Sequence, residues 1–280
     1  MAFLIDGKKI SAEIKDELKE KVAALNAEGK YPCLAVILVG NDPASQVYVN
    51  NKKKACAYIG IKSLSYELSE DVSEEELLNL VRELNDNPEC NGILVQLPLP
   101  KHIDEQKVIK TISPDKDVDG FHPESVGRLS IGTRGFKSCT PAGIIELLKR
   151  SNIETDGKEC VIIGRSNIVG KPMGMLMLRE NSTVTICHSH TANLKEVCKR
   201  ADILIVAIGK REMIDESYVK PGATVIDVGM HRKEDGHLCG DVLFESVCKV
   251  AGAITPVPGG VGPMTIAMLM NNIVGAFYED

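Results

Sequence analysis

The segment from Val161 to Met173 has the residue pattern of a phosphate-binding turn. A short apolar run ends at Gly164, Arg165 and Ser166 follow, and a Lys-Pro pair opens a helical stretch after Gly170. This order predicts a strand, a phosphate-cradling turn and a helix N-terminus, where free backbone N–H groups attract anions. Five residues separate the glycines, so the segment departs from the usual G-x-G-x-x-G spacing. It predicts a variant dinucleotide-binding turn.

The next predicted strand indicates which dinucleotide binds. Thr183–Cys187 is an apolar strand pattern, and His188, Ser189 and His190 follow it. NAD sites commonly place a carboxylate here to bind the ribose 2′-hydroxyl. In this chain no carboxylate would repel a 2′-phosphate, and Arg165 could pair with one. The pattern predicts NADP as the cofactor and leaves NAD possible.

A second group of reactive residues lies on the helix predicted after Pro43. Ser45, Tyr48 and Lys52 are spaced i, i+3 and i+7, so they share one helix face. A hydroxyl, a phenol and an ammonium group together suit proton transfer beside a flat, polar substrate. The alternative interpretation is a solvated lysine face with a half-buried tyrosine, and spacing alone leaves both open.

Two further polar residues, Gln96 and Asp119, are candidates for substrate binding. Gln96 ends a strand in VQLPLP, where open α/β sheets bind ligands, or it is an ordinary strand-terminating residue. Asp119 lies in DKDVDGFHP, which either binds an N–H-rich heterocycle or forms an Asp-rich turn. The spacing of glycine and glutamate around DKDVDGFHP does not fit a calcium-binding loop. His188 and His190 could bind zinc only with a second pair of ligands, and the sequence places none nearby. No metal site is expected.

Strand and helix patterns alternate along most of the chain, which predicts an α/β fold with parallel sheets. The segment 113–140 lacks a clear period, and a domain boundary is placed after it. A glycine-proline turn, Pro258–Pro263, precedes a last apolar helix and either approaches a ligand closely or simply forms a tight turn. The expected strands are 34–39, 65–68, 92–96, 160–163, 183–187, 203–207 and 224–228, and the expected helices are 10–25, 43–60, 73–85, 105–111 and 141–150.

Composition narrows the class of protein. A length of 280 residues suggests two domains, and a net charge of −6 gives no general attraction to nucleic acid or anionic membranes. No apolar run reaches membrane-spanning length, and the N-terminus lacks a signal peptide. Nine cysteines without a C-x-x-C pair predict buried thiols in a reducing compartment. A cytoplasmic protein is expected.

Six ordered motifs together resemble one enzyme family, the bifunctional methylenetetrahydrofolate dehydrogenases and methenyltetrahydrofolate cyclohydrolases. The resemblance spans nearly the whole chain and fits the compact bacterial form. Its motifs are VGNDPASQVYVNNKKKAC (39–56), GILVQLPLP (92–100), PDKDVDGFHP (114–123), CTPAG (139–143), VIIGRSNIVGKPM (161–173) and TPVPGGVGPMT (255–265).

The resemblance implies two α/β domains around a cleft and a homodimer formed through the cofactor domain. Residues 1–138 with 259–280 would form the folate-binding catalytic domain, and 139–258 a Rossmann-type NADP-binding domain. The implied reactions oxidise methylenetetrahydrofolate and hydrolyse the methenyl product, in the one-carbon metabolism that supplies purine, histidine and methionine biosynthesis.

The resemblance also assigns roles to individual residues. Lys52 is implied as the central catalytic residue, with Tyr48 beside it, Gln96 hydrogen-bonded to it and Asp119 on the pterin ring. The folate pocket would further involve Ser45, Pro258, Gly259, Gly260 and Gly262. The cofactor would contact Gly164, Arg165, Ser166, Ser189 and Met230.

Two departures from the family pattern concern the cofactor. His190 stands where lysine is common, and Met230-His231-Arg232 stands where Ile-Asn-Arg is usual. Both leave NADP preferred and NAD use possible. Two alternatives stay open: an NADP dehydrogenase for a carboxylate substrate such as a shikimate-like acid, and a pseudoenzyme that binds NADP and a partner.

Overall fold

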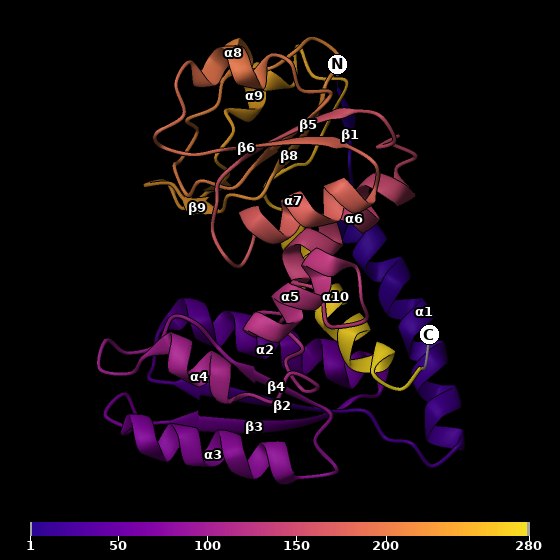
Figure 1. Ribbon diagram of the computed structural model, residues 1–280, viewed down its shortest axis with the longest axis vertical. Coiled ribbons are helices and arrows are strands. Elements are labelled where there is room, and N and C mark those ends of the chain that lie inside the picture. Colours follow the sequence, from indigo (N-terminus) through magenta and orange to yellow (C-terminus); the bar gives the residue numbers. More distant parts are fainter. Residues whose placement is uncertain (1, 279–280) are drawn as a thin grey trace. The chain divides into compact units, whose positions relative to one another are not determined.

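The chain forms two separate parallel sheets with buried, mostly apolar central strands in the computed structural model, which describes residues 2–278 (Figure 1). The chain divides into two compact units. The six-stranded unit comprises the residues up to Ser11 and Ser138–Thr265, and the three-stranded unit comprises Ala12–Lys137 and the residues from Ile266 onward. The predicted α/β fold class with two domains is confirmed.

The unit boundaries differ from the predicted ones at both ends of the chain. The prediction grouped residues 1–138 with 259–280. The first residues instead join the six-stranded unit, because β1 (Phe3–Leu4) pairs in parallel with β11 (Ala253–Ile254). Near the C-terminus the division falls inside the last helix, after Thr265. A two-residue strand carries no periodicity, so this pairing leaves no pattern in the sequence.

The six-stranded sheet has the order β1-β11-β8-β7-β5-β6, and every pairing is parallel. Figure 1 shows α8 and α9 on one face of it and α6 and α7 on the other. Because both faces are covered, the central strands are continuous apolar runs. The elements are β5 (Glu159–Ile163), β6 (Thr183–Cys187), β7 (Ile203–Val206), β8 (Thr224–Asp227), α6 (Cys139–Arg150), α7 (Gly170–Arg179), α8 (Leu194–Cys198) and α9 (Phe244–Val247).

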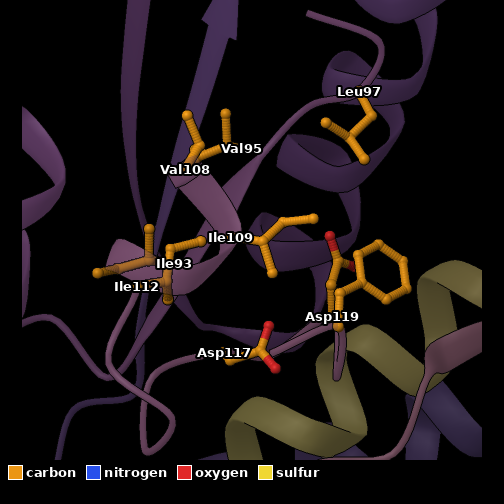
Figure 2. A pocket seen from close by; sticks show the side chains of 9 residues that line it. Ile93, Val95, Leu97, Val108, Ile109, Ile112, Asp117 and Asp119 are labelled. Carbon is orange, nitrogen blue, oxygen red and sulfur yellow. The ribbon is translucent and has the colours of Figure 1, made fainter. Parts of the chain in front are cut away.

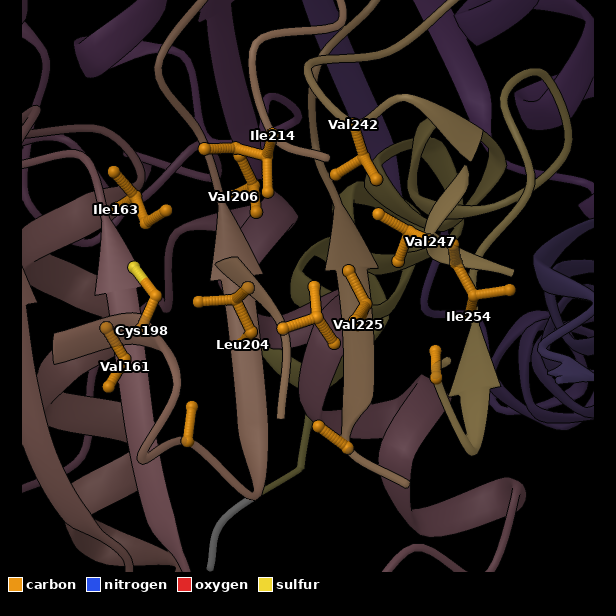
Figure 3. Packing of buried hydrophobic residues seen from close by; sticks show 14 of the residues in the cluster. Val161, Ile163, Cys198, Leu204, Val206, Ile214, Val225, Val242, Val247 and Ile254 are labelled. Atoms are coloured by element: carbon orange, nitrogen blue, oxygen red, sulfur yellow. The ribbon is translucent and has the colours of Figure 1, made fainter. Parts of the chain in front are cut away.

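One hydrophobic core of this unit lies between the sheet and α8 and α9. Figure 3 shows alternate strand residues, such as Val161, Leu204 and Val225, packed on this face with Val247. A 3₁₀ turn (Glu216–Tyr218) and a short hairpin, β9 (His231–Arg232) with β10 (Leu238–Cys239), complete the unit. The core therefore fixes the carboxyl ends of four neighbouring strands at one edge.

The three-stranded sheet has the order β3-β2-β4, again all parallel. Helices α2 and α3 cover its opposite faces (Figure 1). The elements are β2 (Cys33–Val39), β3 (Lys62–Leu68), β4 (Gly92–Val95), α2 (Pro43–Ile59), α3 (Glu74–Asp86), α4 (Glu105–Thr111) and α5 (Pro123–Ile131). Two helices, α1 (Gly7–Ala27) and α10 (Val261–Gly275), contribute residues to both units.

Most predicted elements are confirmed within a few residues, and the helices α5 and α9 were missed. The segment expected to be irregular contains α5, which begins after the His122 cap with Pro123 in its first turn. Gly127 and the short length of α5 hide its period in the sequence. Among residues 2–278, no helix is both long and apolar enough to span a membrane.

Candidate active site

Lys52 lies on the inward face of α2. Ser45 and Lys52 are buried on the same stripe as Val49, Cys56 and Ile59, so two polar residues occupy positions that the helix otherwise gives to apolar ones. Lys52 is only 8% exposed, whereas Lys54 is exposed. The interpretation of a solvated lysine face is therefore wrong for Lys52.

Hydrogen bonds at its ends fix where α2 begins and stops. Asp42 accepts a hydrogen bond from the backbone N–H of Ser45 at 2.7 Å, with Pro43 in the first turn, and Gly60 closes the helix in the left-handed conformation. With both ends fixed, Tyr48 comes to the border of the stripe, 37% exposed. Burial raises the pKa of Tyr48, so its phenol is neutral and can donate a proton at neutral pH.

A hydrogen bond joins Lys52 to Gln96, as the resemblance implies. Lys52 Nζ donates to Gln96 Oε1 at 2.9 Å. Gln96 Nε2 donates to the carbonyl of Leu97 at 2.7 Å, and the Gln96 backbone N–H donates to the Ile37 carbonyl at 2.9 Å. Both halves of the amide are therefore engaged, which aims its oxygen at the ammonium group.

A buried aspartate organises the turn that carries Asp119. Asp117 Oδ2 accepts hydrogen bonds from the His122 backbone N–H and from Ser125 Oγ, both at 2.8 Å. The Gly120 N–H donates to the Asp117 carbonyl at 2.9 Å. Burial raises the pKa of Asp117 to about 6. Asp117 thus anchors the turn and leaves Asp119 directed elsewhere.

Asp119 is the partly exposed carboxylate of this turn. Burial raises its pKa, and the Lys52 ammonium opposes that rise, so the two groups interact electrostatically. Figure 2 shows Asp117 and Asp119 at the side of an otherwise apolar pocket. The apolar lining is Ile93, Val95, Leu97, Val108, Ile109, Ile112 and Phe121. The three-stranded unit therefore brings Lys52, Gln96 and Asp119 together, with Tyr48 and Ser45 on the same helix.

The predicted phosphate turn lies at the carboxyl edge of the six-stranded sheet. Gly164 has φ +129°, and a Cβ there would lie 2.2 Å from the Ala207 carbonyl oxygen. A Cβ on Gly170 would lie 2.1 Å from the Gly164 carbonyl oxygen. Both positions therefore require glycine. Ser166 Oγ accepts hydrogen bonds from the N–H groups of Val169 and Gly170 as α7 begins, which leaves its own O–H to donate.

The side chains around this turn suit a phosphate group. Arg165 and Ser166 follow β5, and Ser189 and His190 follow β6, its paired neighbour in the sheet. All four are exposed, and residues 188–190 include no carboxylate. A guanidinium, two hydroxyls and an imidazole at a helix N-terminus fit the phosphates of a dinucleotide. No metal-binding arrangement of three or more His, Cys, Asp or Glu side chains occurs within residues 2–278.

The remaining predicted residues also lie in the six-stranded unit. Met230 is 47% exposed just before β9. Gly259 has φ +105°, and its carbonyl accepts a hydrogen bond from the Lys8 N–H at 2.9 Å. A Cβ on Gly260 would lie 2.6 Å from the Pro256 carbonyl oxygen. The turn that also holds Pro258 and Gly262 is thus tightly built, and its role in folate binding stays a prediction.

Sequence reasoning missed two buried carboxylates of this unit. Asp227 is 4% exposed at the end of β8, and Asp241 is fully buried after β10. One signal was available, since Asp227 directly ends the apolar run Thr224–Ile226. A charged residue at the carboxyl end of a buried parallel strand commonly faces a ligand site or supports one.

Comparisons with known proteins identify the family of the chain. A family model described as "Tetrahydrofolate dehydrogenase/cyclohydrolase, catalytic domain" matches residues 5–119, and one described as its NAD(P)-binding domain matches residues 138–280. A "Bifunctional protein FolD" from Agathobacter rectalis is 70% identical over 276 residues, covering 99% of each chain.

Solved structures give the same result. The bifunctional FolD enzyme from Campylobacter jejuni is 51% identical, with a TM-score of 0.97 and coverage of 99% of this chain and 98% of that one. A Trypanosoma brucei FolD complexed with NADP and an inhibitor is 40% identical, with a TM-score of 0.93 and coverage of 99% and 97%.

The shikimate-like alternative shares only the fold. A shikimate 5-dehydrogenase from Thermus thermophilus is 15% identical with a TM-score of 0.57. Both family models and the whole-length relatives point instead to folate chemistry. The chain therefore belongs to the tetrahydrofolate dehydrogenase/cyclohydrolase family.

Proposed function

We propose that Lys52 is the proton-transfer residue of a single folate pocket that serves two reactions. The chain oxidises 5,10-methylenetetrahydrofolate to the 5,10-methenyl form and hydrolyses that product to 10-formyltetrahydrofolate. The observation that carries the proposal is the buried Lys52 ammonium, held 2.9 Å from Gln96 Oε1 and within electrostatic reach of Asp119.

The hydrolytic step is the one that needs a protein acid and base. Water adds to the methenyl carbon and loses a proton, and the ring nitrogen that departs from this carbon gains one. Lys52 transfers these protons, while Gln96 fixes the position of its Nζ. The neutral Tyr48 phenol, on the border of the same helix face, supplies a hydrogen-bond donor. Asp119 accepts hydrogen bonds from the amino edge of the pterin ring.

The oxidative step makes different demands. The bound dinucleotide supplies the hydride acceptor. No protein base is required, since the folate nitrogen lone pairs stabilise the cation that remains when hydride leaves. The chain contributes orientation of the folate, which is worth several powers of ten in rate. The residues that are essential for hydrolysis are therefore dispensable, in part, for oxidation.

NADP is the preferred dinucleotide in this proposal. Arg165, Ser166 and Ser189 are exposed at the turn and supply donors to a 2′-phosphate, and residues 188–190 include no repelling carboxylate. The T. brucei relative was solved with NADP, which supports the same preference. His190 in place of a lysine weakens the positive field, so NAD is used as a poorer substitute.

An absorbance assay of the purified protein tests the proposed function. Methylenetetrahydrofolate is supplied with NADP and separately with NAD, and methenyltetrahydrofolate is then supplied alone. Faster reduction of NADP, together with loss of the methenyl chromophore, is the expected result. Cofactor reduction without hydrolysis would contradict the role of Lys52. Dinucleotide binding without any turnover would favour the pseudoenzyme.

We also propose a homodimer that works in the cytoplasm, where its product supports purine, histidine and methionine biosynthesis. Strand β6 ends the six-stranded sheet, so one edge of the cofactor-binding unit offers backbone groups for pairing with another chain. None of the nine cysteines, all of which lie within residues 2–278, forms a disulfide, which suits a reducing compartment. Sedimentation should give twice the chain mass of 30.4 kDa, and a monomer mass at micromolar concentration would contradict the dimer.

A further inference from the structure

Two buried carboxylates hold together the loops beside the dinucleotide turn. Asp227 Oδ1 accepts hydrogen bonds from the backbone N–H groups of Gly229 at 3.0 Å and Asp241 at 2.9 Å. Asp227 Oδ2 accepts another from the Val242 N–H at 3.0 Å. Asp227 thus ties the end of β8 to the segment that follows β10.

Asp241 extends this connection to two more segments. Its Oδ2 accepts hydrogen bonds from the N–H groups of Ile208 at 2.8 Å and Gly209 at 3.0 Å, in the loop after β7. Its Oδ1 lies 2.7 Å from His231 Nε2 on β9. One fully buried carboxylate therefore fixes both the loop after β7 and the β9–β10 hairpin.

The two carboxylates of this cluster are almost completely buried, so they depend on hydrogen-bond partners within the protein. Burial, together with the neighbouring Asp241 carboxylate, raises the pKa of Asp227 to about 6. His231, with its side chain 23% exposed, is the basic group that contacts Asp241 directly. The nearby Lys233 ammonium is instead paired with Glu212 at 2.5 Å.

The connected loops lie next to the residues predicted to bind the dinucleotide. Ala207 directly precedes Ile208, and its carbonyl oxygen lies close to Gly164. Met230, a predicted cofactor contact, directly precedes His231. In the order β6-β5-β7-β8, the strands that follow β5 in the chain lie on both sides of it, and open α/β sheets bind nucleotides at such a switch point. The cluster of Asp227, Asp241 and His231 therefore supports loops that adjoin the predicted dinucleotide site.

We propose that the His231–Asp241 pair is a positioning device for the dinucleotide, holding residues 207–209 and Met230 in their binding geometry. The proposal rests on the assignment of the Gly164–Ser166 turn as the dinucleotide site. His231 contacts no reacting atom, and it acts through Asp241 on the two loops.

Hydrolysis of methenyltetrahydrofolate provides an internal control, because that reaction needs no dinucleotide. His231→Ala should raise the dissociation constant and the KM for NADP about tenfold or more, since it removes the side chain that contacts the buried Asp241 Oδ1 at 2.7 Å. The hydrolytic rate and the KM for methenyltetrahydrofolate should stay at wild-type values. His231→Asn, which retains an N–H donor, should recover part of the NADP affinity.

His237→Ala is the matched control variant. His237 lies on the same hairpin with its side chain 81% exposed, and its loss should leave both reactions unchanged. An unchanged NADP affinity in His231→Ala would overturn the proposal, as would an equal loss of hydrolysis, because that would indicate a merely structural role. A wild-type protein that does not reduce NADP would instead reject the proposed function itself.

Discussion

Lys52 is a cationic side chain in a position that α2 otherwise gives to apolar residues. A lysine with an 8% exposed surface has lost most of its water, and Gln96 Oε1 replaces only part of that hydration. Burial and this hydrogen bond hold the ammonium group in one place, where a solvated lysine would sample many positions. Lys54, two residues away, is exposed, so position on the helix rather than residue type creates the reactive group.

Arg165 is the residue at which cofactor preference can be tested. Arg165→Ala should raise the KM for NADP much more than the KM for NAD, since only NADP carries the 2′-phosphate that a guanidinium binds. The expected loss for NADP is about tenfold or more. Initial rates of methylenetetrahydrofolate oxidation with each dinucleotide give both constants.

Arg179→Ala serves as the control for this experiment. Arg179 is also exposed and lies on α7, in its last turn rather than at its start. Its removal should change neither constant. Equal changes for NADP and NAD in Arg165→Ala would reject the role of Arg165 at the 2′-phosphate.

At the scale of elements, the turn that carries Asp119 depends on the ionisation of Asp117. Burial raises the pKa of Asp117 from 3.8 to about 6. Its stabilising contribution is therefore fully present below the ordinary value and is lost as pH rises toward 6. The loss corresponds to about 3 kcal/mol.

Asp117→Asn removes this dependence, because an amide does not ionise and its oxygen can still accept from Ser125. The Tm of the variant minus the Tm of the wild type should therefore increase between pH 4 and pH 7. Thermal unfolding across that range measures the difference. A constant difference would show that Asp117 does not titrate inside the folded turn.

The phosphate turn depends on a glycine for steric reasons. In Gly164→Ala the new Cβ would lie 2.2 Å from the Ala207 carbonyl oxygen, at a φ of +129°. The free energy of unfolding should fall by about 1–3 kcal/mol, with a larger loss of NADP reduction than of hydrolysis. Urea unfolding and the two assays measure these effects.

Gly127→Ala is a control with the opposite expectation. Gly127 is an exposed position of α5, and no neighbouring atom lies within 4 Å of the place that a Cβ would occupy there. Alanine there should stabilise the helix by up to about 1 kcal/mol. If Gly164→Ala were as stable as the wild type, the close approach of the turn to Ala207 would be wrong.

Elements with a strong local signal could be predicted from the sequence. The Ser73–Glu76 capping box and the Asp42-Pro43 start each satisfy backbone groups within a few residues, and both helices begin where predicted. The strands β1 and β11 could not be predicted. Each has two residues, and their pairing joins positions about 250 residues apart in the chain.

At the scale of the whole molecule, the function could be predicted from the order of the motifs along the chain. The structure adds which side chains are buried. Spacing placed Ser45, Tyr48 and Lys52 on one face but could not show that this face turns inward. The cluster of Asp227, Asp241 and His231 was missed because its members meet only through tertiary structure. Hydrogen bonds from a side chain to backbone N–H groups in a distant segment leave no pattern in a single sequence.

The central claim is that one pocket serves both reactions and that only hydrolysis needs Lys52. The most direct measurement compares oxidation of methylenetetrahydrofolate and hydrolysis of methenyltetrahydrofolate in Lys52→Met, with Lys54→Met as the matched control. Lys52→Met should lose about 100-fold or more of the hydrolytic rate and retain measurable NADP reduction, while Lys54→Met keeps both activities. A wild-type hydrolytic rate in Lys52→Met would contradict the account.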